Sequence, residues 1–279
     1  MKNILKRKQD ILVGSSKLNY ENRPVFDKKK FMIENMSSNK AFLNIVEKKK
    51  LNENEKNELL KNFKDKYEKY RNNWVNSLKV KNKTKPLSVD IEIAAICDLA
   101  CPHCSREFLV TPDKVINFKL YKSIIDQAVK LDVPSVKLIW RGEPLLHPKV
   151  KELIQYAKES GIIEVIINTN GTNLDEKKAN ELIDSGLDQL IYSFDGGTKK
   201  TYEKMRPGRF KKNSFEKVYE NIKKFSEIRN KLNSKFPVTK IQMILTRDSR
   251  DEVENFFALF KPIVDEVTIT QYNERGGNL

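Results

Sequence analysis

From Ser88 onward, short apolar runs rich in β-branched residues alternate with longer stretches whose apolar positions recur three and four residues apart. The short runs predict strands at Ser88–Ala95, Ser135–Trp140, Glu164–Thr169, Gln189–Phe194, Thr239–Leu245 and Glu266–Tyr272. The longer stretches predict helices at Lys119–Leu131, Pro148–Ser160, Asp175–Ser185, Ser214–Leu232 and Asp248–Phe260. Strands that alternate with helices are typical of parallel pairing through right-handed crossovers. The pattern therefore predicts an α/β fold, a partial (β/α)6 TIM-like barrel, rather than the closed eight-stranded form.

The N-terminal third has a different pattern. Residues 1–40 are polar and weakly periodic, which predicts loop and a short helix. Residues 41–80 carry apolar side chains at near-helical intervals and are predicted to be helical. Because the basic segment Lys79–Pro86 follows, we divide the chain into a basic, mainly helical N-terminal extension at 1–85 and a core barrel at 86–279.

The net charge of +15 belongs almost entirely to that extension. Residues 1–85 hold 23 Lys and Arg against 10 Asp and Glu, whereas residues 86–279 hold 30 against 28. A basic arm can meet nucleic acid or an acidic partner, but a solvated lysine-rich helical surface is the simpler interpretation, which we favour. The aromatic residues Tyr67, Tyr70 and Trp74 recur at helix-like spacing, which indicates a packing stripe rather than a base-stacking platform.

The sequence predicts no contact with a membrane. It has no apolar run near the ~18–20 residues that cross a bilayer. The N-terminus is basic but lacks the apolar stretch and cleavage site of a secretory signal. We therefore expect a cytoplasmic protein, and the tight cluster of an odd number of cysteines fits such a reducing compartment.

Unusual polar clusters follow the first four predicted strands. Cys97 follows the first strand, Gly142-Glu143-Pro144 the second, Asn168 to Gly171 the third and Ser193 to Gly196 the fourth. In parallel α/β sheets, ligands sit beyond the carboxyl ends of the strands. We therefore expect the four clusters to meet on one rim of the barrel.

The chain has only three cysteines, spaced as Cys97-x3-Cys101-x2-Cys104. Thiolates on one short loop are typical ligands of iron–sulfur clusters, and three of them hold three corners of a four-iron cluster while one iron stays open. Zinc sites usually combine two C-x2-C pairs, and His103 lies between two cysteines, where chelation would be strained. An iron–sulfur cluster is the favoured interpretation, with a zinc site or inert buried thiols as alternatives.

The run from Cys97 to Cys104 resembles the signature loop of the radical SAM superfamily, and the resemblance extends over about residues 88–275. The chain is most similar to the subset with a SPASM-type region after the barrel. The resemblance implies that Cys97, Cys101 and Cys104 bind a [4Fe–4S] cluster, whose open iron takes S-adenosyl-L-methionine. It further implies an electron donor such as flavodoxin or ferredoxin, and cleavage of the sulfonium to methionine and a 5′-deoxyadenosyl radical that abstracts hydrogen from a substrate.

The segment Arg141-Gly142-Glu143-Pro144 resembles the family's Gly-Gly-Glu-Pro, whose backbone and glutamate hold the methionine ammonium. Arg141 replaces the first glycine, and we expect it to narrow the approach to the cofactor. The alternative is an ordinary strand-to-helix turn with Pro144 at the helix start. The resemblance places Asn170 near the ribose of the cofactor, although Asn-Gly turns are common in loops.

The remaining cofactor-binding predictions also come from the resemblance. Ser193 resembles a serine that binds the cofactor's carboxylate or ribose, and Arg206 corresponds to an arginine that pairs with the methionine carboxylate. His103 occupies a position that packs near the adenine. Gln242, and the stretch that begins at Gln271, are candidates for the adenine or substrate side. Arg206 as a surface residue and His103 as a loop residue are the alternatives.

The substrate is the least determined part of this hypothesis. A peptide or protein is our first choice, a small molecule such as a sugar or cofactor precursor is second, and RNA is third, since only the basic arm supports it. SPASM-type relatives carry further cysteines after the barrel, and without these no auxiliary cluster is expected here. A non-catalytic metal-binding module that contacts nucleic acid is the alternative from another functional class.

Overall fold

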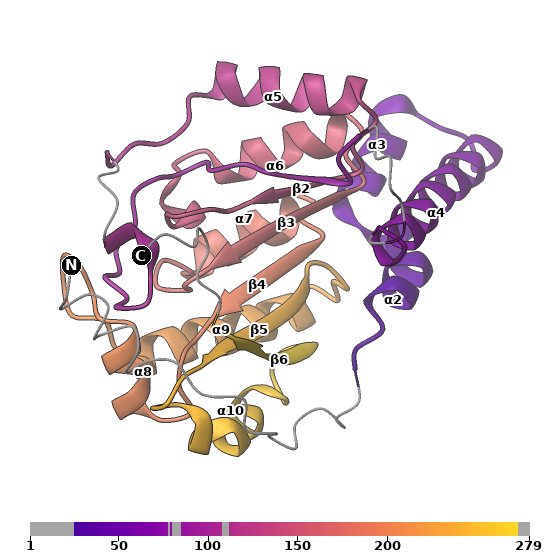
Figure 1. The fold of residues 1–279 in the computed structure, drawn as a ribbon. Coiled ribbons are helices and arrows are strands. Elements are labelled where there is room, and N and C mark those ends of the chain that lie inside the picture. The colour runs from indigo at the N-terminus through magenta and orange to yellow at the C-terminus, as the bar shows by residue number, and fades with distance from the viewer. Residues whose placement is uncertain (1–24, 78, 80–84, 108–111, 273–279) are drawn as a thin grey trace.

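A computed structural model describes residues 25–77, 79, 85–107 and 112–272. Its centre is one sheet of six parallel strands that pair in chain order. The strands are β1 (Ser88–Asp90), β2 (Ser135–Leu138), β3 (Glu164–Thr169), β4 (Gln189–Ser193), β5 (Val238–Leu245) and β6 (Glu266–Gln271). An open six-stranded parallel sheet with helices between its strands confirms the predicted α/β partial barrel (Figure 1).

Each inner strand divides its side chains between two environments. On β3, Val165 and Ile167 are fully buried within the main hydrophobic cluster, beneath the helices. Ile166 and Asn168, one position away on the same strand, line cavities on the other face of the sheet. This alternation follows from the two-residue repeat of a strand. The face of the sheet that packs against the helices is therefore apolar, and the face that lines the interior of the barrel is largely polar.

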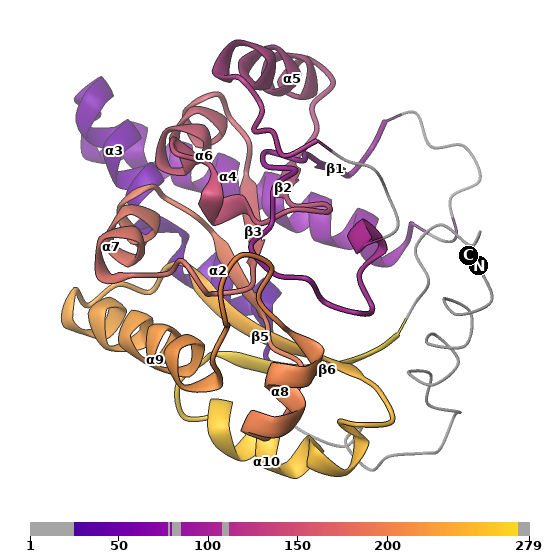
Figure 2. The same cartoon turned by 90° about the vertical axis from the view of Figure 1, so that its left-hand side faces the viewer.

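The helices of the barrel cover the outer face of the sheet, where Figure 2 shows α5, α6, α7, α9 and α10 around the strands. They are α5 (Phe118–Lys130), α6 (Val150–Glu159), α7 (Glu176–Asp184), α8 (Lys199–Met205), α9 (Phe215–Lys231) and α10 (Val253–Phe260). Short 3-10 turns lie at Ser105–Glu107, Pro144–Leu146 and Arg250–Glu252. Helix α8 was not predicted from the sequence, because its seven residues, KKTYEKM, are too few to show a helical period.

Two other predictions about the elements are wrong. The strand predicted at Ser88–Ala95 ends at Asp90, because the chain then leaves the sheet: Ala94 forms an antiparallel bridge with Val115. The helix predicted over 41–80 is divided into α3 (Lys40–Lys49) and α4 (Glu53–Val75), and α2 (Lys28–Asn35) and a 3-10 turn (Met36–Ser38) precede them. The division occurs where Lys50 takes a left-handed conformation (φ 51°) and Asn52 caps α4.

The N-terminal helices close the floor of the barrel, the end at which the strands begin (Figure 1). Glu164, the first residue of β3, accepts hydrogen bonds from the hydroxyls of Tyr67 (3.3 Å) and Tyr70 (3.2 Å) of α4. Lys28 of α2 forms an ion pair with the same carboxylate at 2.8 Å. The predicted packing role of Tyr67 and Tyr70 is thus confirmed, while the Trp74 side chain is 47% exposed.

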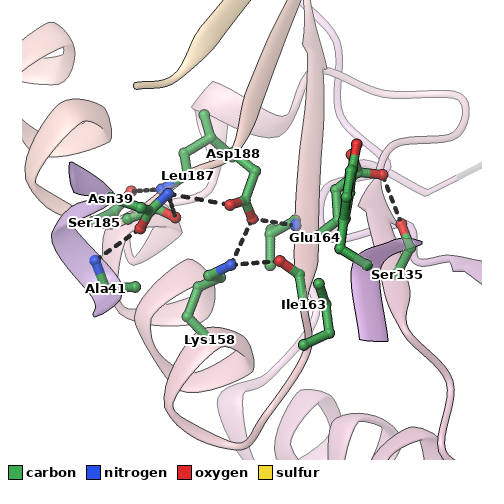
Figure 3. Close-up of polar contacts among 12 residues, drawn as sticks. Asn39, Ala41, Ser135, Lys158, Ile163, Glu164, Ser185, Leu187 and Asp188 are labelled. Carbon is green, nitrogen blue, oxygen red and sulfur yellow. Dashed lines mark hydrogen bonds and ion pairs between the residues drawn. The ribbon is translucent and has the colours of Figure 1, made fainter. Parts of the chain in front are cut away.

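A second buried carboxylate at the floor joins α3 to the barrel (Figure 3). Asp188 accepts hydrogen bonds from Lys158 Nζ and the Val165 amide, both at 2.7 Å, and from the Asn39 side chain at 3.1 Å. Because the helices share this network and a hydrophobic cluster with the strands, the division of the chain at residue 85 stays a prediction. Among the described helices, none has the length and apolar character needed to cross a membrane.

Candidate functional site

The polar clusters that follow the strands meet in one pocket of about 310 Å³ at the rim of the barrel. All three cysteines line it, and so do most of the predicted cofactor-binding residues: His103, Gly142, Glu143, Asn170, Ser193, Arg206 and Gln242. Pro144 does not line the pocket; it is buried at the start of the 3-10 turn Pro144–Leu146, as its structural alternative anticipated. The topology therefore brings together residues that are up to 175 positions apart, from Cys97 to Tyr272.

Asp98 holds the cysteine loop against the loop that follows β3. Its carboxylate accepts hydrogen bonds from Asn170 Nδ2 (2.8 Å), Thr172 Oγ1 (2.5 Å) and Asn173 Nδ2 (2.9 Å). The Asn170 amide also lies 3.9 Å from the sulfur of Cys97. Asn170 therefore contacts both the loop that carries the thiols and the carboxylate that fixes this loop.

The other side of the cysteine loop pairs with the segment after α8. Leu99 forms an antiparallel bridge with Gly208, and the Ala100 amide donates to the Pro207 carbonyl at 2.8 Å. Gly208 cannot be replaced without rearrangement, because an added Cβ would lie 1.7 Å from the Lys211 carbonyl oxygen. The loop is thus held between two backbone segments, and its three thiols are positioned by protein contacts alone.

Glu143 is almost completely buried and joins β2 to β3 at the rim. Its carboxylate accepts hydrogen bonds from Thr169 Oγ1 (2.7 Å), the Asn170 amide (2.7 Å) and the Leu145 amide (3.0 Å). Burial outweighs these hydrogen bonds and raises the pKa of Glu143 to about 7. All three donors are neutral, so the carboxylate reaches the pocket without a positive charge to balance it.

Asp195, fully buried at the end of β4, brings two pocket residues together. Arg206 Nη2 lies 2.7 Å and His103 Nε2 lies 3.3 Å from Asp195 Oδ2, while Oδ1 accepts from the Ile244 amide at 2.7 Å. Burial alone would raise the pKa of Asp195, but the charge of Arg206 and the contact with His103 hold it well below its usual range. Asp195 is therefore ionised and holds Arg206 and His103 in fixed orientations.

Three buried polar atoms of the pocket have no hydrogen-bond partner within the described part of the chain. They are Arg206 Nε, His103 Nδ1 and Asn168 Oδ1. Buried polar groups in native proteins are almost always paired, so each such atom calls for an explanation. All three residues line the same pocket, which makes a polar ligand in that pocket the simplest explanation.

The backbone at Gly142 approaches the cysteine loop more closely than any side chain would allow. An added Cβ would lie 2.0 Å from the Ala94 carbonyl oxygen and 2.6 Å from that of Ile96. Arg141 beside it directs its guanidinium to Glu92, with Nε at 3.0 Å and Nη2 at 2.6 Å from the carboxylate. Arg141 also lines the pocket, so the expectation that it narrows the approach remains a prediction.

The donor set fits an iron–sulfur cluster. Burial raises the pKa of the Cys97 thiol to about 12 and also raises that of Cys101, so both are protonated until a metal displaces the proton. No three His, Cys, Asp or Glu side chains of the described residues converge to hold a single metal ion. A four-iron cluster takes each thiolate on a different iron, so its ligands need not converge on one point.

Asp98, Asp195 and Asn168 are the main residues of this site to which the sequence analysis gave no role. Asp98 lies inside the cysteine motif, and Asn168 and Asp195 lie inside the polar clusters that follow β3 and β4. Their positions were therefore visible in the sequence. Their partners were not, because these come from loops that only the folded barrel brings together.

Comparison with known proteins is consistent with this geometry. The model of the radical SAM superfamily matches residues 91–260. GTP 3′,8-cyclase of Parasynechococcus marenigrum is 32% identical over 127 residues, which cover 42% of this chain and 36% of the cyclase. Mycofactocin maturase MftC of Mycolicibacterium smegmatis is 26% identical over 191 residues, or 68% of this chain and 46% of the maturase. The chain thus spans about a third to a half of the length of these curated relatives.

Solved structures share the fold at lower identity. Streptococcus suis SuiB bound to S-adenosylmethionine has a TM-score of 0.58 at 20% identity, with 96% of this chain and 64% of that chain covered. The anSMEcpe structure with bound AdoMet has a TM-score of 0.55, also at 20% identity, with 69% and 54% covered. These likenesses show that the six-stranded barrel is an architecture seen in proteins that bind this cofactor.

Proposed function

The chain belongs to the radical SAM superfamily, and on that premise we propose that it is an enzyme whose rim pocket holds a [4Fe–4S] cluster and S-adenosyl-L-methionine. The observation that carries the proposal is one pocket that combines three thiols with buried, unpartnered polar atoms of Arg206 and His103. When bound, the cluster supplies the electron that cleaves the sulfonium, and the resulting 5′-deoxyadenosyl radical abstracts hydrogen from the substrate.

In this proposal Cys97, Cys101 and Cys104 ligate the cluster, and their loop is held by Asp98 and by the bridge to Gly208. The loop contributes no fourth cysteine, which leaves one iron open to the cofactor. Asn170, whose amide is 3.9 Å from Cys97, stabilises the thiolate form, since a hydrogen-bond donor favours the charged state of its acceptor.

The two ends of the methionine portion are matched by opposite charges. Arg206, oriented by Asp195, presents its unpartnered Nε to the cofactor's carboxylate. Glu143, which has only neutral donors around it, supplies negative charge for the ammonium together with the backbone at Gly142. A cation next to Glu143 would lower the raised pKa of its carboxyl and keep it ionised.

The other rim residues face the remaining parts of the cofactor. Ser193 and Gln242, neighbours in the β4–β5 register, line the pocket wall and are assigned to the ribose and adenine side. His103 is fixed by Asp195 through Nε2, so its Nδ1 is the atom left for the adenine. Pro144 fixes the turn that carries Glu143 rather than touching the cofactor.

A peptide or protein is the favoured substrate class. The maturase MftC aligns with 68% of this chain, whereas the cyclase aligns with 42%. SuiB, the structural neighbour described above, has also been solved bound to the precursor peptide SuiA. A small molecule is the second candidate, since the cyclase relative is the more identical of the two over its shorter match. An electron donor such as flavodoxin or ferredoxin and a cytoplasmic location are further parts of this proposal.

The test is an oxygen-free assay of the full chain reconstituted with iron and sulfide. With dithionite and S-adenosyl-L-methionine, we expect release of 5′-deoxyadenosine, measured by liquid chromatography, and none without dithionite. Cys101→Ala, Cys97→Ala and Cys104→Ala should each abolish it, together with the visible absorbance of the cluster. Cofactor cleavage by Cys101→Ala at the wild-type rate would refute the assignment.

A further inference from the structure

The inner face of the barrel continues below the rim pocket into two adjoining cavities of about 580 Å³ and 590 Å³. They share Arg71, Gln189 and Ile191, and we call them together the lower chamber. The floor helices α2 and α4 contribute part of its walls. Cavities of this size are large enough for a small molecule or for several side chains of a peptide.

The lower chamber and the rim pocket lie on the same strands, one layer apart. On β4, Ser193 lines the rim pocket and Ile191 the lower chamber. On β5 the corresponding residues are Gln242 and Lys240, and on β3 they are Asn168 and Ile166. Two residues along a strand span roughly 6.6 Å. The linings of the rim pocket and of the lower chamber are therefore separated by about one such step along the strands.

Most charges of the lower chamber are already paired. Lys28 forms an ion pair with Glu164 at 2.8 Å, and Lys240 forms one with Glu266 at 2.8 Å. Asp27 is engaged as the N-cap of α2, where it accepts from the Lys30 amide at 2.9 Å. Lys29 forms an ion pair with Glu68 at 3.5 Å, and Lys85 forms one with Asp132. The lining also contains Asp90, Lys137 and Arg71.

Arg71 differs from the lysines that have a carboxylate partner. Among the described residues, no carboxylate lies within ion-pair distance of its guanidinium. Instead, its Cζ atom lies 5.5 Å from the ring centre of Tyr70 and 6.0 Å from that of Trp74. Aromatic packing orients the guanidinium, and one contact to the Tyr70 side chain is a hydrogen bond. The remaining N–H donors suit the planar, two-point recognition of a carboxylate or phosphate.

We propose that the lower chamber binds an anionic group of the substrate, a carboxylate or a phosphate, with Arg71 as its principal ligand. The identity of that group as part of a substrate rests on the proposed function, whereas the anion site itself does not. The site gives the N-terminal helices a role in recognition, because Arg71 and Lys28 come from α4 and α2. An acidic side chain of a peptide and a phosphorylated small molecule are the two sources of such a group.

The proposal can be tested by fluorescence, because the chain has two tryptophans and one of them is Trp74. In a Trp140→Phe background, Trp74 alone reports on its neighbour Arg71. The full chain is titrated with N-acetyl-glutamate amide, with inorganic phosphate, and with neutral N-acetyl-glutamine amide. We expect a saturable change with at least one anion and none with the neutral compound.

Arg71→Gln should weaken the anion's affinity at least tenfold. Arg250→Gln, which removes one charge from a half-exposed arginine outside the lining of the lower chamber, is the matched control and should leave it within twofold. Arg71→Lys keeps the charge without the planar fork and should weaken binding about threefold or more. It serves as the second variant if Arg71→Gln unfolds in a thermal melt followed by circular dichroism.

The titrations distinguish the two sources of the anionic group and can also refute the site. Binding of the carboxylate alone supports the site and assigns an acidic peptide, while binding of phosphate alone supports it and assigns a phosphorylated small molecule. Absence of saturable binding with both anions, or unchanged affinity in both Arg71 variants, overturns the proposal. Because the titration needs no cluster and no S-adenosyl-L-methionine, its failure is distinguishable from a failure of the proposed function.

Discussion

Glu143 and Glu164 are buried glutamates at opposite ends of the barrel, and their surroundings differ. Glu164 at the floor has Lys28 beside it at 2.8 Å as well as two tyrosine hydroxyls, and its pKa is lowered because these partners outweigh burial. Glu143 at the rim has only neutral donors, and burial raises its pKa to about 7. Both ends contain a buried glutamate, yet only the glutamate at the floor has a cationic partner within the described part of the chain.

The difference shows which buried carboxylates the fold pairs with a cation of its own and which one it leaves for a ligand. The floor pairs each of its two buried carboxylates with a lysine, Lys28 for Glu164 and Lys158 for Asp188. The rim leaves Glu143 without a cation and leaves Arg206 Nε without an acceptor. A cofactor with one ammonium and one carboxylate would supply both missing partners. The following four experiments compare the two ends, from the largest expected effect to the smallest.

Removal of the floor carboxylate should have the largest effect. Glu164→Ala leaves Lys28 without its carboxylate partner and two buried tyrosine hydroxyls without an acceptor, so we expect the free energy of unfolding to fall by ~3–5 kcal/mol. Urea denaturation followed by circular dichroism measures it. Glu53→Ala, where the side chain is 80% exposed beside Lys56, is the matched control and should change stability by less than about 0.5 kcal/mol. Equal effects of the two variants would contradict the comparison.

The two glutamates should also give stability opposite dependences on pH. The folded-state pKa of Glu143 is above the usual 4.5, so between pH 4.5 and 7 the folded chain holds a proton that the unfolded chain releases. Relative to Glu143→Gln, wild-type stability should therefore fall by about 3 kcal/mol as pH rises through this window, and then level off.

Glu164 should behave in the opposite way. Its folded-state pKa is below 4.5, so its contribution is present above pH 4.5 and is lost as pH falls below that value. Relative to Glu164→Gln, wild-type stability should therefore rise with pH. Both pairs are measured by urea denaturation of cluster-free, cofactor-free protein, the Glu143 pair from pH 4 to pH 8 and the Glu164 pair from pH 6 down to pH 2. Slopes of the same sign for Glu143 and Glu164 would show that the two environments do not differ as described.

The charge of Glu143 should matter for binding more than for folding. Glu143→Gln keeps an acceptor for Thr169 and Asn170 but removes the negative charge, so at pH 8 we expect the affinity for S-adenosyl-L-methionine to fall about tenfold, or ~1.4 kcal/mol. Calorimetry on the reconstituted protein without oxygen measures it. Glu164→Gln is the control at the floor, and an equal loss of affinity in that variant would remove the functional distinction between the ends.

The sequence predicted those strands and helices that the spacing of nearby apolar residues determines. The strand at Glu164–Thr169 was predicted with its observed bounds, because apolar β-branched residues dominate it. The first strand was predicted five residues too long, because its end depends on Ala94 pairing with Val115 across a loop. The break between α3 and α4 at Lys50 was missed because apolar residues recur at helical spacing both before and after it.

The rim could be predicted because each strand end lies next to its own motif in the sequence. The three cysteines and the residues near Gly142, Asn170 and Ser193 all line the predicted pocket. The ion pairs of Asp195 could not be predicted, since His103, Asp195 and Arg206 lie on three separate segments. The role of the N-terminal helices at the floor was equally hidden, because Tyr67 and Glu164 meet across 97 residues of chain.

Two buried asparagines offer the smallest but most closely matched test. Asn39 at the floor accepts from the Ala41 amide at 2.8 Å and donates to Asp188 at 3.1 Å. Asn170 at the rim accepts from the Thr172 amide at 2.9 Å and donates to Asp98 at 2.8 Å. Each side chain stabilises a turn and donates a hydrogen bond to an aspartate carboxylate. Replacement by alanine should therefore lower the free energy of unfolding by about 1–2 kcal/mol at either position.

Only the rim asparagine lies next to a proposed cluster ligand, with its amide 3.9 Å from Cys97. Asn170→Ala should therefore lose iron faster than wild type on exposure to a chelator, while Asn39→Ala should keep wild-type kinetics. Iron content per chain and visible absorbance, both followed over time, measure the difference. If Asn39→Ala loses iron as fast as Asn170→Ala, then the rate of iron loss follows the stability of the whole fold, and the contact between Asn170 and Cys97 has no separate effect on the cluster.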